Sequence, residues 1–170
     1  MPMAFEYAMS IGPTCRAAYH LRRCLGPAAI KGVFDWQVTP AAAFVKYLER
    51  DFSGLLDFLD LEQTSEGVRN IRFDTLHPHG FTGPLPLAYP EARARHDHLC
   101  ARTRAALKGP AGLVLWLSDP ISLEDEAMMS NALRFYSPDL VYRVARAPRA
   151  GSDGPDWRGN NAEWDVALES

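Results

Sequence analysis

Cys15 is the residue of this sequence whose type and position best suit covalent chemistry. It follows a short apolar run and the turn Gly12-Pro13, at the start of an expected helix. Backbone N–H groups at a helix start lack intrahelical partners and carry partial positive charge, so they favour a thiolate over a thiol. The same groups can donate hydrogen bonds to an oxyanion that forms on a substrate carbonyl. Thr14 and Arg16, on either side of the thiol, are therefore candidate substrate-binding residues.

A nucleophilic thiol needs a histidine base within hydrogen-bonding reach. His77 and His79 lie in a stretch rich in proline and glycine, just after an expected strand. Such loops commonly present working side chains from a rigid scaffold. His96 and His98 are two residues apart among charged residues, which predicts a solvated helix face.

Two other kinds of site compete with a reactive thiol. Four arginines fall on one expected helix: Arg93, Arg95, Arg102 and Arg104. Arg95 and Arg102 share a face of that helix and are candidates to bind phosphate or carboxylate groups. His77 and His79 have the spacing of two zinc ligands on an extended segment, but no established zinc motif accompanies them. The sequence therefore predicts no metal site and no other cofactor, and it leaves open an anion-binding role for the arginines.

Apolar patterning and turn residues predict an α/β protein. Strands are expected over residues 4–11, 68–73, 113–117 and 140–144. Helices are expected over residues 14–25, 40–60 (one or two), 90–107 and 122–135, and loop-rich stretches over 76–90 and from about 147. The order of elements favours a single layered domain over residues 1–170, with a mostly parallel sheet flanked by helices.

Composition and charge narrow the classes of function. The 170 residues are 47% hydrophobic and 23% charged, enough for a core that needs neither a metal nor a disulfide. A net charge of -3 gives no reason to expect nucleic-acid binding, and no apolar run approaches the ~18 residues of a membrane span. Three cysteines and no secretory leader fit a reducing cytoplasm, where Cys24 and Cys100 are expected to fill the core. These features predict a cytoplasmic protein that acts on a small molecule or a peptide, and they leave its oligomeric state open.

Several short motifs together resemble a known family. The opening Ser10-Ile-Gly-Pro-Thr-Cys15, the pair Leu21-Arg22 and the triplet Phe34-Asp35-Trp36 resemble the signature of a bacterial family of unknown function catalogued as papain-like cysteine peptidases. That signature runs Ser-Leu-Gly, a cysteine three residues later, Leu-Arg and then Phe-Asp-Trp. The segment His79-Gly80-Phe81 departs from the family's His-Asp-Phe, and residues 156–165 resemble the family's ending. The resemblance spans nearly the whole chain and is most specific at its start.

The resemblance implies Cys15 as nucleophile and His79 as base, with His77 as second choice. In papain-like enzymes the chain order is Cys, His and then Asn or Asp. Three residues of this chain compete to orient the imidazole: Asn160, which keeps that order, Asp35 and Asp119. The resemblance also implies an α+β papain-like fold as the alternative to a mostly parallel sheet.

These observations lead to two hypotheses. In the first, the protein is a cysteine-dependent hydrolase or acyl-transfer enzyme, in which Cys15 attacks a carbonyl carbon and His79 moves the proton. In the second, a non-catalytic or transferase-like α/β domain binds an anionic small molecule or a glycan through Arg95 and Arg102. Trp36, interpreted as a packing anchor, is also a candidate substrate-binding residue.

Overall fold

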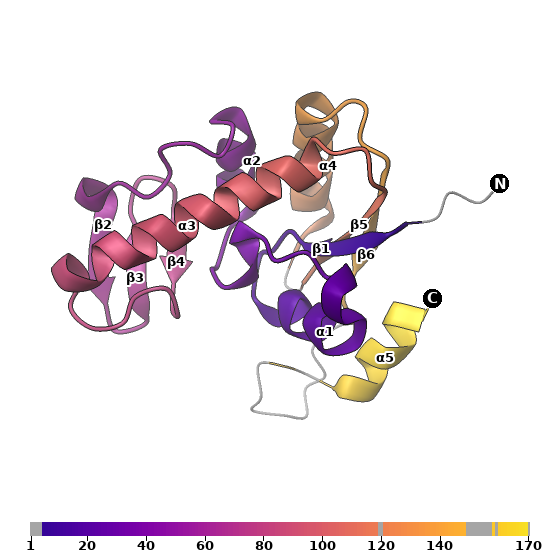
Figure 1. The fold of residues 1–170 in the computed structure, drawn as a ribbon, viewed down its shortest axis with the longest axis horizontal. Coiled ribbons are helices and arrows are strands. Elements are labelled where there is room, and N and C mark those ends of the chain that lie inside the picture. The colour runs from indigo at the N-terminus through magenta and orange to yellow at the C-terminus, as the bar shows by residue number, and fades with distance from the viewer. Residues whose placement is uncertain (1–4, 119–120, 149–157, 159, 170) are drawn as a thin grey trace.

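The computed structural model describes residues 5–118, 121–148, 158 and 160–169 and contains two small sheets connected by helices (Figure 1). The first sheet is parallel throughout and has the strand order β1-β5-β6. Its strands are β1 (Tyr7–Ser10), β5 (Leu113–Leu117) and β6 (Tyr142–Arg146). β5 is the central strand and all of its residues are buried, as its continuous apolar run predicts.

Helices α1 (Arg16–Leu25) and α5 (Asn161–Glu169) pack on one face of the parallel sheet. Val114 and Trp116 of the sheet form a core cluster with them, which includes Trp164 of α5. Trp164 is 1% exposed. Trp164 therefore anchors α5 to the core on this face of the parallel sheet.

The opposite face of the parallel sheet is covered by α2 (Ala41–Glu49), α3 (Leu85–Leu107) and α4 (Leu123–Tyr136). Leu113 and Leu115, which alternate with the residues facing α1, point into this larger cluster. With helices on both faces of a parallel sheet, the predicted α/β class is confirmed. Within the described residues, no helix is long and apolar enough to cross a membrane.

A second, antiparallel sheet is a feature that the sequence does not predict. It contains β2 (Leu61–Thr64), β3 (Gly67–Asn70) and β4 (Thr75–His77) in that order. The strand expected over residues 68–73 overlaps β3 alone. β2 and β4 are four and three residues long, too short for alternation to be recognised. The prediction of a mostly parallel sheet is therefore right for one sheet and wrong for the other.

Two predicted helix boundaries are wrong. α2 ends at Glu49, and residues 50–60 form turns and a short 3-10 helix in place of the expected helix. α3 begins at Leu85 instead of Pro90. Pro86 lies in the first turn, where its missing N–H would have no intrahelical partner, and Pro90 lies within the helix.

Backbone hydrogen bonds connect the two sheets through the segment that follows the 3-10 helix Val33–Asp35. Val38 and Leu76 form an isolated antiparallel bridge, with N···O distances of 2.8 and 3.1 Å. The Thr39 N–H donates to the Pro13 carbonyl oxygen at 2.8 Å. This segment is thus held between the turn after β1 and strand β4.

Gly67 is required where β3 begins, because the backbone around His77 passes close to it. A Cβ at Gly67 would lie 2.6 Å from the His77 carbonyl oxygen and 2.7 Å from the Pro78 Cα, and φ at Gly67 is +134°. Gly67→Ala is therefore expected to lower the free energy of unfolding by about 1–3 kcal/mol in urea denaturation, through backbone strain and steric overlap. Gly80→Ala is the matched control, since its Cβ would lie 3.7 Å from the His77 Cβ in ordinary contact. Equal stability of the two variants would contradict this assignment.

Candidate functional site

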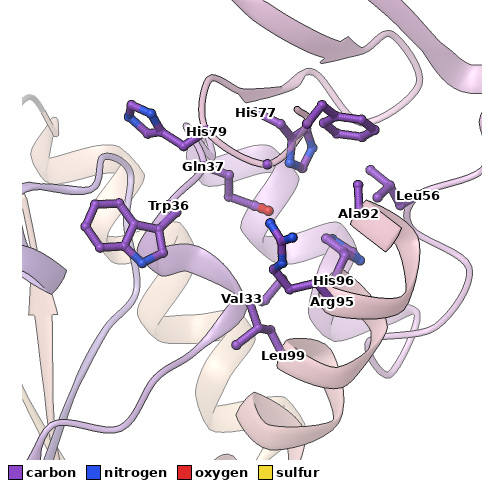
Figure 2. Close-up of a pocket in the computed structure, with 12 residues that line it drawn as sticks. Val33, Trp36, Gln37, Leu56, His77, His79, Ala92, Arg95, His96 and Leu99 are labelled. Atoms are coloured by element: carbon purple, nitrogen blue, oxygen red, sulfur yellow. The ribbon is translucent and has the colours of Figure 1, made fainter. Parts of the chain in front are cut away.

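A cavity of about 290 Å³ lies where the middle of α3 meets the segment after Val33–Asp35 and the loop after β4 (Figure 2). Leu56 adds to its wall, so four separate parts of the chain contribute to it. Most of the wall is apolar or aromatic, as is usual for small-molecule sites. Its polar side chains are Gln37, His77, His79, Arg95 and His96.

Arg95 brings a permanent positive charge into this cavity. Figure 2 shows its side chain among the labelled residues that line the cavity. The Gln37 Nε2 donates to the Thr39 Oγ1 at 2.9 Å and to the Tyr47 hydroxyl at 3.1 Å, so its amide oxygen remains on the cavity side. Arg95 also donates to Glu91 at 2.7 Å, but the Glu91 side chain is 83% exposed and such pairs contribute little stability. An anion in the cavity could replace Glu91 without breaking a buried ion pair.

His96 belongs to a buried hydrogen-bonding network behind the cavity. Its Nε2 lies 2.9 Å from the Tyr47 hydroxyl oxygen, and its Nδ1 lies 3.6 Å from the Cys100 Sγ. Burial lowers the pKa of His96 to about 4, and burial raises the pKa of the Cys100 thiol to about 12. Near pH 7 the pair is therefore a neutral imidazole and a neutral thiol. This contact orients the ring and does not activate a nucleophile.

His77 is a second buried histidine on the cavity wall. Its Nε2 lies 3.0 Å from the Thr75 hydroxyl oxygen, and its ring centroid lies 6.0 Å from that of His96. Burial, together with the nearby His96, lowers the pKa of His77 to about 3. Both rings are therefore neutral at pH 7, and each carries one donor and one acceptor nitrogen.

Trp36 and Phe81 supply the aromatic part of the wall. The Trp36 ring meets His79 edge-on, with 6.1 Å between ring centroids. Phe81 meets His77 in the same way, also at 6.1 Å. Flat aromatic surfaces of this kind suit a flat, mostly apolar part of a ligand.

Cys15 occupies the N-terminal cap position of α1, at the carboxyl end of β1, and does not line the cavity. Burial raises the pKa of its thiol, and the backbone and Arg16 offset this effect only in part. Burial of the thiol therefore opposes the thiolate that the helix start is expected to favour. Thr14, a candidate substrate-binding residue, hydrogen-bonds Ser118, with 2.8 Å between the hydroxyl oxygens. Within the described part of the chain, no hydrogen bond joins Cys15 to a histidine.

The structure places the expected orienting groups in other contacts. Asp35 is buried and pairs with Arg22 at 2.8 Å. Asn160 accepts a hydrogen bond at 2.9 Å from the backbone N–H two residues further on, at the start of α5. Asp119 lies outside the described residues. His79 lines the cavity beside Trp36, and among the described residues neither Asp35 nor Asn160 is hydrogen-bonded to it.

The two arginines expected to bind an anion are also separated. Arg95 lines the cavity, whereas Arg102 is exposed two turns further along α3 and does not. The positive charge of Arg102 instead favours the charged form of the Asp35 carboxylate. Of the candidate binding residues, the cavity thus combines Arg95 with Trp36 and with the two histidines of the loop stretch.

Sequence reasoning missed the buried side of α3. His96 is expected on a solvated face because its neighbours are charged, yet it is 6% exposed. Four buried residues follow one another at helical spacing: Ala92, His96, Cys100 and Thr103. This spacing is the signal that could have identified His96 as buried. Tyr47 carries no comparable signal for its contact with His96, because the two residues are 49 positions apart in the sequence.

No metal centre emerges from the described residues: nowhere among them do three or more His, Cys, Asp or Glu side chains form a group that could hold a metal ion. His77 is buried against Thr75 and His96, while His79 is exposed. The zinc alternative for His77 and His79 therefore gains no further ligand in the described part of the chain.

The two buried histidines predict a loss of stability in mild acid. A histidine with a lowered pKa in the folded state stabilises the fold fully above about pH 6.5. This contribution is lost as the pH falls toward about 4 for His96 and about 3 for His77. For each proton that is taken up on unfolding, the free energy of unfolding falls by about 1.4 kcal/mol more per unit decrease in pH.

His77→Gln is expected to flatten the pH dependence of the free energy of unfolding between about pH 6 and 4.5, by up to the slope of one proton. Urea denaturation at a series of pH values measures this slope. His98→Gln is the matched control, because His98 is exposed on the same helix as His96. A His77→Gln slope equal to that of the wild type would contradict the assignment of His77 as a buried neutral ring.

Comparisons of the chain with models of protein families, with curated proteins and with solved structures find no match. The resemblance of the N-terminal motifs to papain-like cysteine peptidases therefore remains an expectation. The cavity around Arg95 is therefore the part of the structure on which the functional assignment is based.

Proposed function

We propose that the protein binds a small, flat molecule with one anionic group, placing the anion at Arg95 and the apolar part against Trp36 and Phe81. The observation that carries this proposal is the Arg95 side chain, which is half exposed and lines a largely apolar cavity (Figure 2). The proposal develops the anion-binding hypothesis, with Arg95 alone as the cation of the site.

The charges of the cavity favour a ligand with a single negative charge. Arg95 is the one permanently charged side chain among the described lining residues, and His77 and His96 are neutral at pH 7. The Arg95 guanidinium can donate paired hydrogen bonds to a carboxylate or phosphate, and solvent screens part of its charge because the side chain is 49% exposed. A second negative charge would find no matching permanent cation there.

The size of the cavity favours a small molecule over a peptide. Ligand pockets commonly measure about 300–1,000 Å³, and this cavity of about 290 Å³ is at the lower end of that range. One or two fused rings with a short acidic substituent suit such a volume. Arg95 and His79 are both exposed, so the charged end of the cavity is in contact with solvent.

Naphthoate, a flat carboxylate of two fused rings, is the probe that tests the proposed function. It is expected to bind the wild type and to bind Arg95→Ala at least about 10-fold more weakly, because a hydrogen bond to a charged group contributes about 1.5–3 kcal/mol. Naphthamide has the same shape without the charge and should bind the wild type as weakly as naphthoate binds Arg95→Ala. Calorimetric titration measures all three affinities.

Arg104→Ala is the matched control, since Arg104 is exposed on the same helix, pairs with Asp51 and lies outside the cavity. This variant should keep the wild-type affinity for naphthoate. Three results would each contradict the proposal. They are equal losses of naphthoate affinity in the two arginine variants, equal wild-type affinities for naphthoate and naphthamide, and no binding of naphthoate at millimolar concentration.

The position of Cys15 favours a second candidate function, a cysteine-dependent hydrolase or acyl-transfer enzyme. Its thiol is half-buried at the carboxyl end of an open parallel sheet, where ligands of such sheets commonly bind. Ser118, at the carboxyl end of β5, lies next to Thr14 at the same edge. The raised pKa of Cys15 places this function second.

Alkylation rates distinguish the two functions. Without activation, half-buried Cys15 is expected to react with iodoacetamide more slowly than exposed Cys24, and Cys100, 2% exposed, should react most slowly. Mass spectrometry after labelling at several pH values measures each rate. Fast labelling of Cys15 alone below about pH 7, lost in His79→Ala, would overturn this order and favour the hydrolase.

A further inference from the structure

Asp35 and Arg22 form an ion pair at one side of the cavity. The Arg22 Nη2 of α1 lies 2.8 Å from the Asp35 Oδ2, and the Asp35 side chain is 3% exposed. The other groups that act on this carboxylate are Arg102 of α3 and the backbone of Gly32, three residues earlier in the chain. The carboxylate is thus held between α1 and α3.

The same guanidinium connects this ion pair to the cavity wall. Its central carbon lies 5.0 Å from the Trp36 ring centroid, a cation–π contact. Trp36 in turn meets His79 edge-on, and both side chains line the cavity. Because Asp35 and Trp36 are adjacent in the chain, the pair fixes both the backbone before the indole and the cation against its ring.

The ion pair is incompletely satisfied. The Asp35 Oδ1 and the Arg22 Nε are buried and have no hydrogen-bond partner among the described residues. Burial raises the pKa of Asp35 from 3.8 to about 6, although Arg22 and Arg102 both favour its charged form. The carboxylate is therefore protonated within a mild pH range, and its attraction for the guanidinium is then lost.

We propose that Asp35 is a positioning residue, which acts through Arg22 to hold the Trp36 ring as a wall of the cavity and releases that wall when it is protonated. The effect on ligands rests on the proposed binding function, whereas the state of Trp36 can be measured without a ligand. As the pH falls, the carboxylate becomes neutral, Arg22 leaves the indole and the affinity for an aromatic anion decreases. Arg95 keeps its charge throughout this range.

The indole N–H resonance of Trp36, assigned by its absence in Trp36→Phe, reports the position of the ring. In the free wild type it is expected to shift in one titration between about pH 7 and 5. Asp35→Asn should remove that titration and hold the resonance near its low-pH position. His79→Gln should keep the titration, which separates the effect of Asp35 from that of the other ring in contact with Trp36.

Naphthoate affinity gives the second readout. In the wild type, this affinity is expected to fall about 2- to 5-fold between pH 7 and 5, because one cation–π contact is lost. Asp35→Asn is expected to show no such fall. Arg22→Gln is the second variant, which should uncouple Trp36 from Asp35 even where Asp35→Asn folds poorly.

The two proposals fail in different ways. A Trp36 resonance that does not titrate in the wild type, or that titrates equally in Asp35→Asn or Arg22→Gln, would overturn the positioning role. Absence of naphthoate binding together with the expected titration would overturn the binding function and leave the positioning role in place.

Discussion

The backbone bridge between Val38 and Leu76 is the contact on which the cavity depends. It pairs the segment that carries Gln37 with the strand that carries His77, so the two side chains come to one cavity from distant parts of the chain. At its other end, the Thr39 N–H anchors the same segment to the turn after β1. Side chains alternate along paired strands, so a slip of one residue in this pairing would turn Gln37 away from the cavity.

The polar groups around the cavity serve the fold and the site through the same hydrogen bonds. Tyr47 is buried and connects Gln37 to His96, while burial raises the pKa of its hydroxyl and keeps it protonated. Buried polar groups are costly unless they are paired, so this network has few alternative arrangements. Gln37 and His96 therefore line the cavity as neutral groups in fixed positions.

Local patterns predict elements, whereas the state of each site residue depends on contacts that are distant in the sequence. The apolar run of β5 predicts a buried strand correctly, but β2 and β4 are too short to be recognised. The sequence places Cys15 correctly at a helix start, but it does not reveal the burial that raises the pKa of the thiol, because that burial comes from the fold. Likewise, Tyr47 is separated by 49 residues from its partner His96, and no local pattern reveals that contact.

Helix α3 runs from the antiparallel sheet to the parallel sheet without interruption (Figure 1). Near its start, the Tyr89 hydroxyl donates to the Leu56 carbonyl oxygen at 2.9 Å, and at its end Leu107 is buried in the core of the parallel sheet. The cavity lies along the middle of this helix, so its width is set by a continuous hydrogen-bonded element. Because this helical wall is already ordered in the folded protein, a ligand would not have to order it on binding. A preformed wall of this kind favours selection of ligands by their shape.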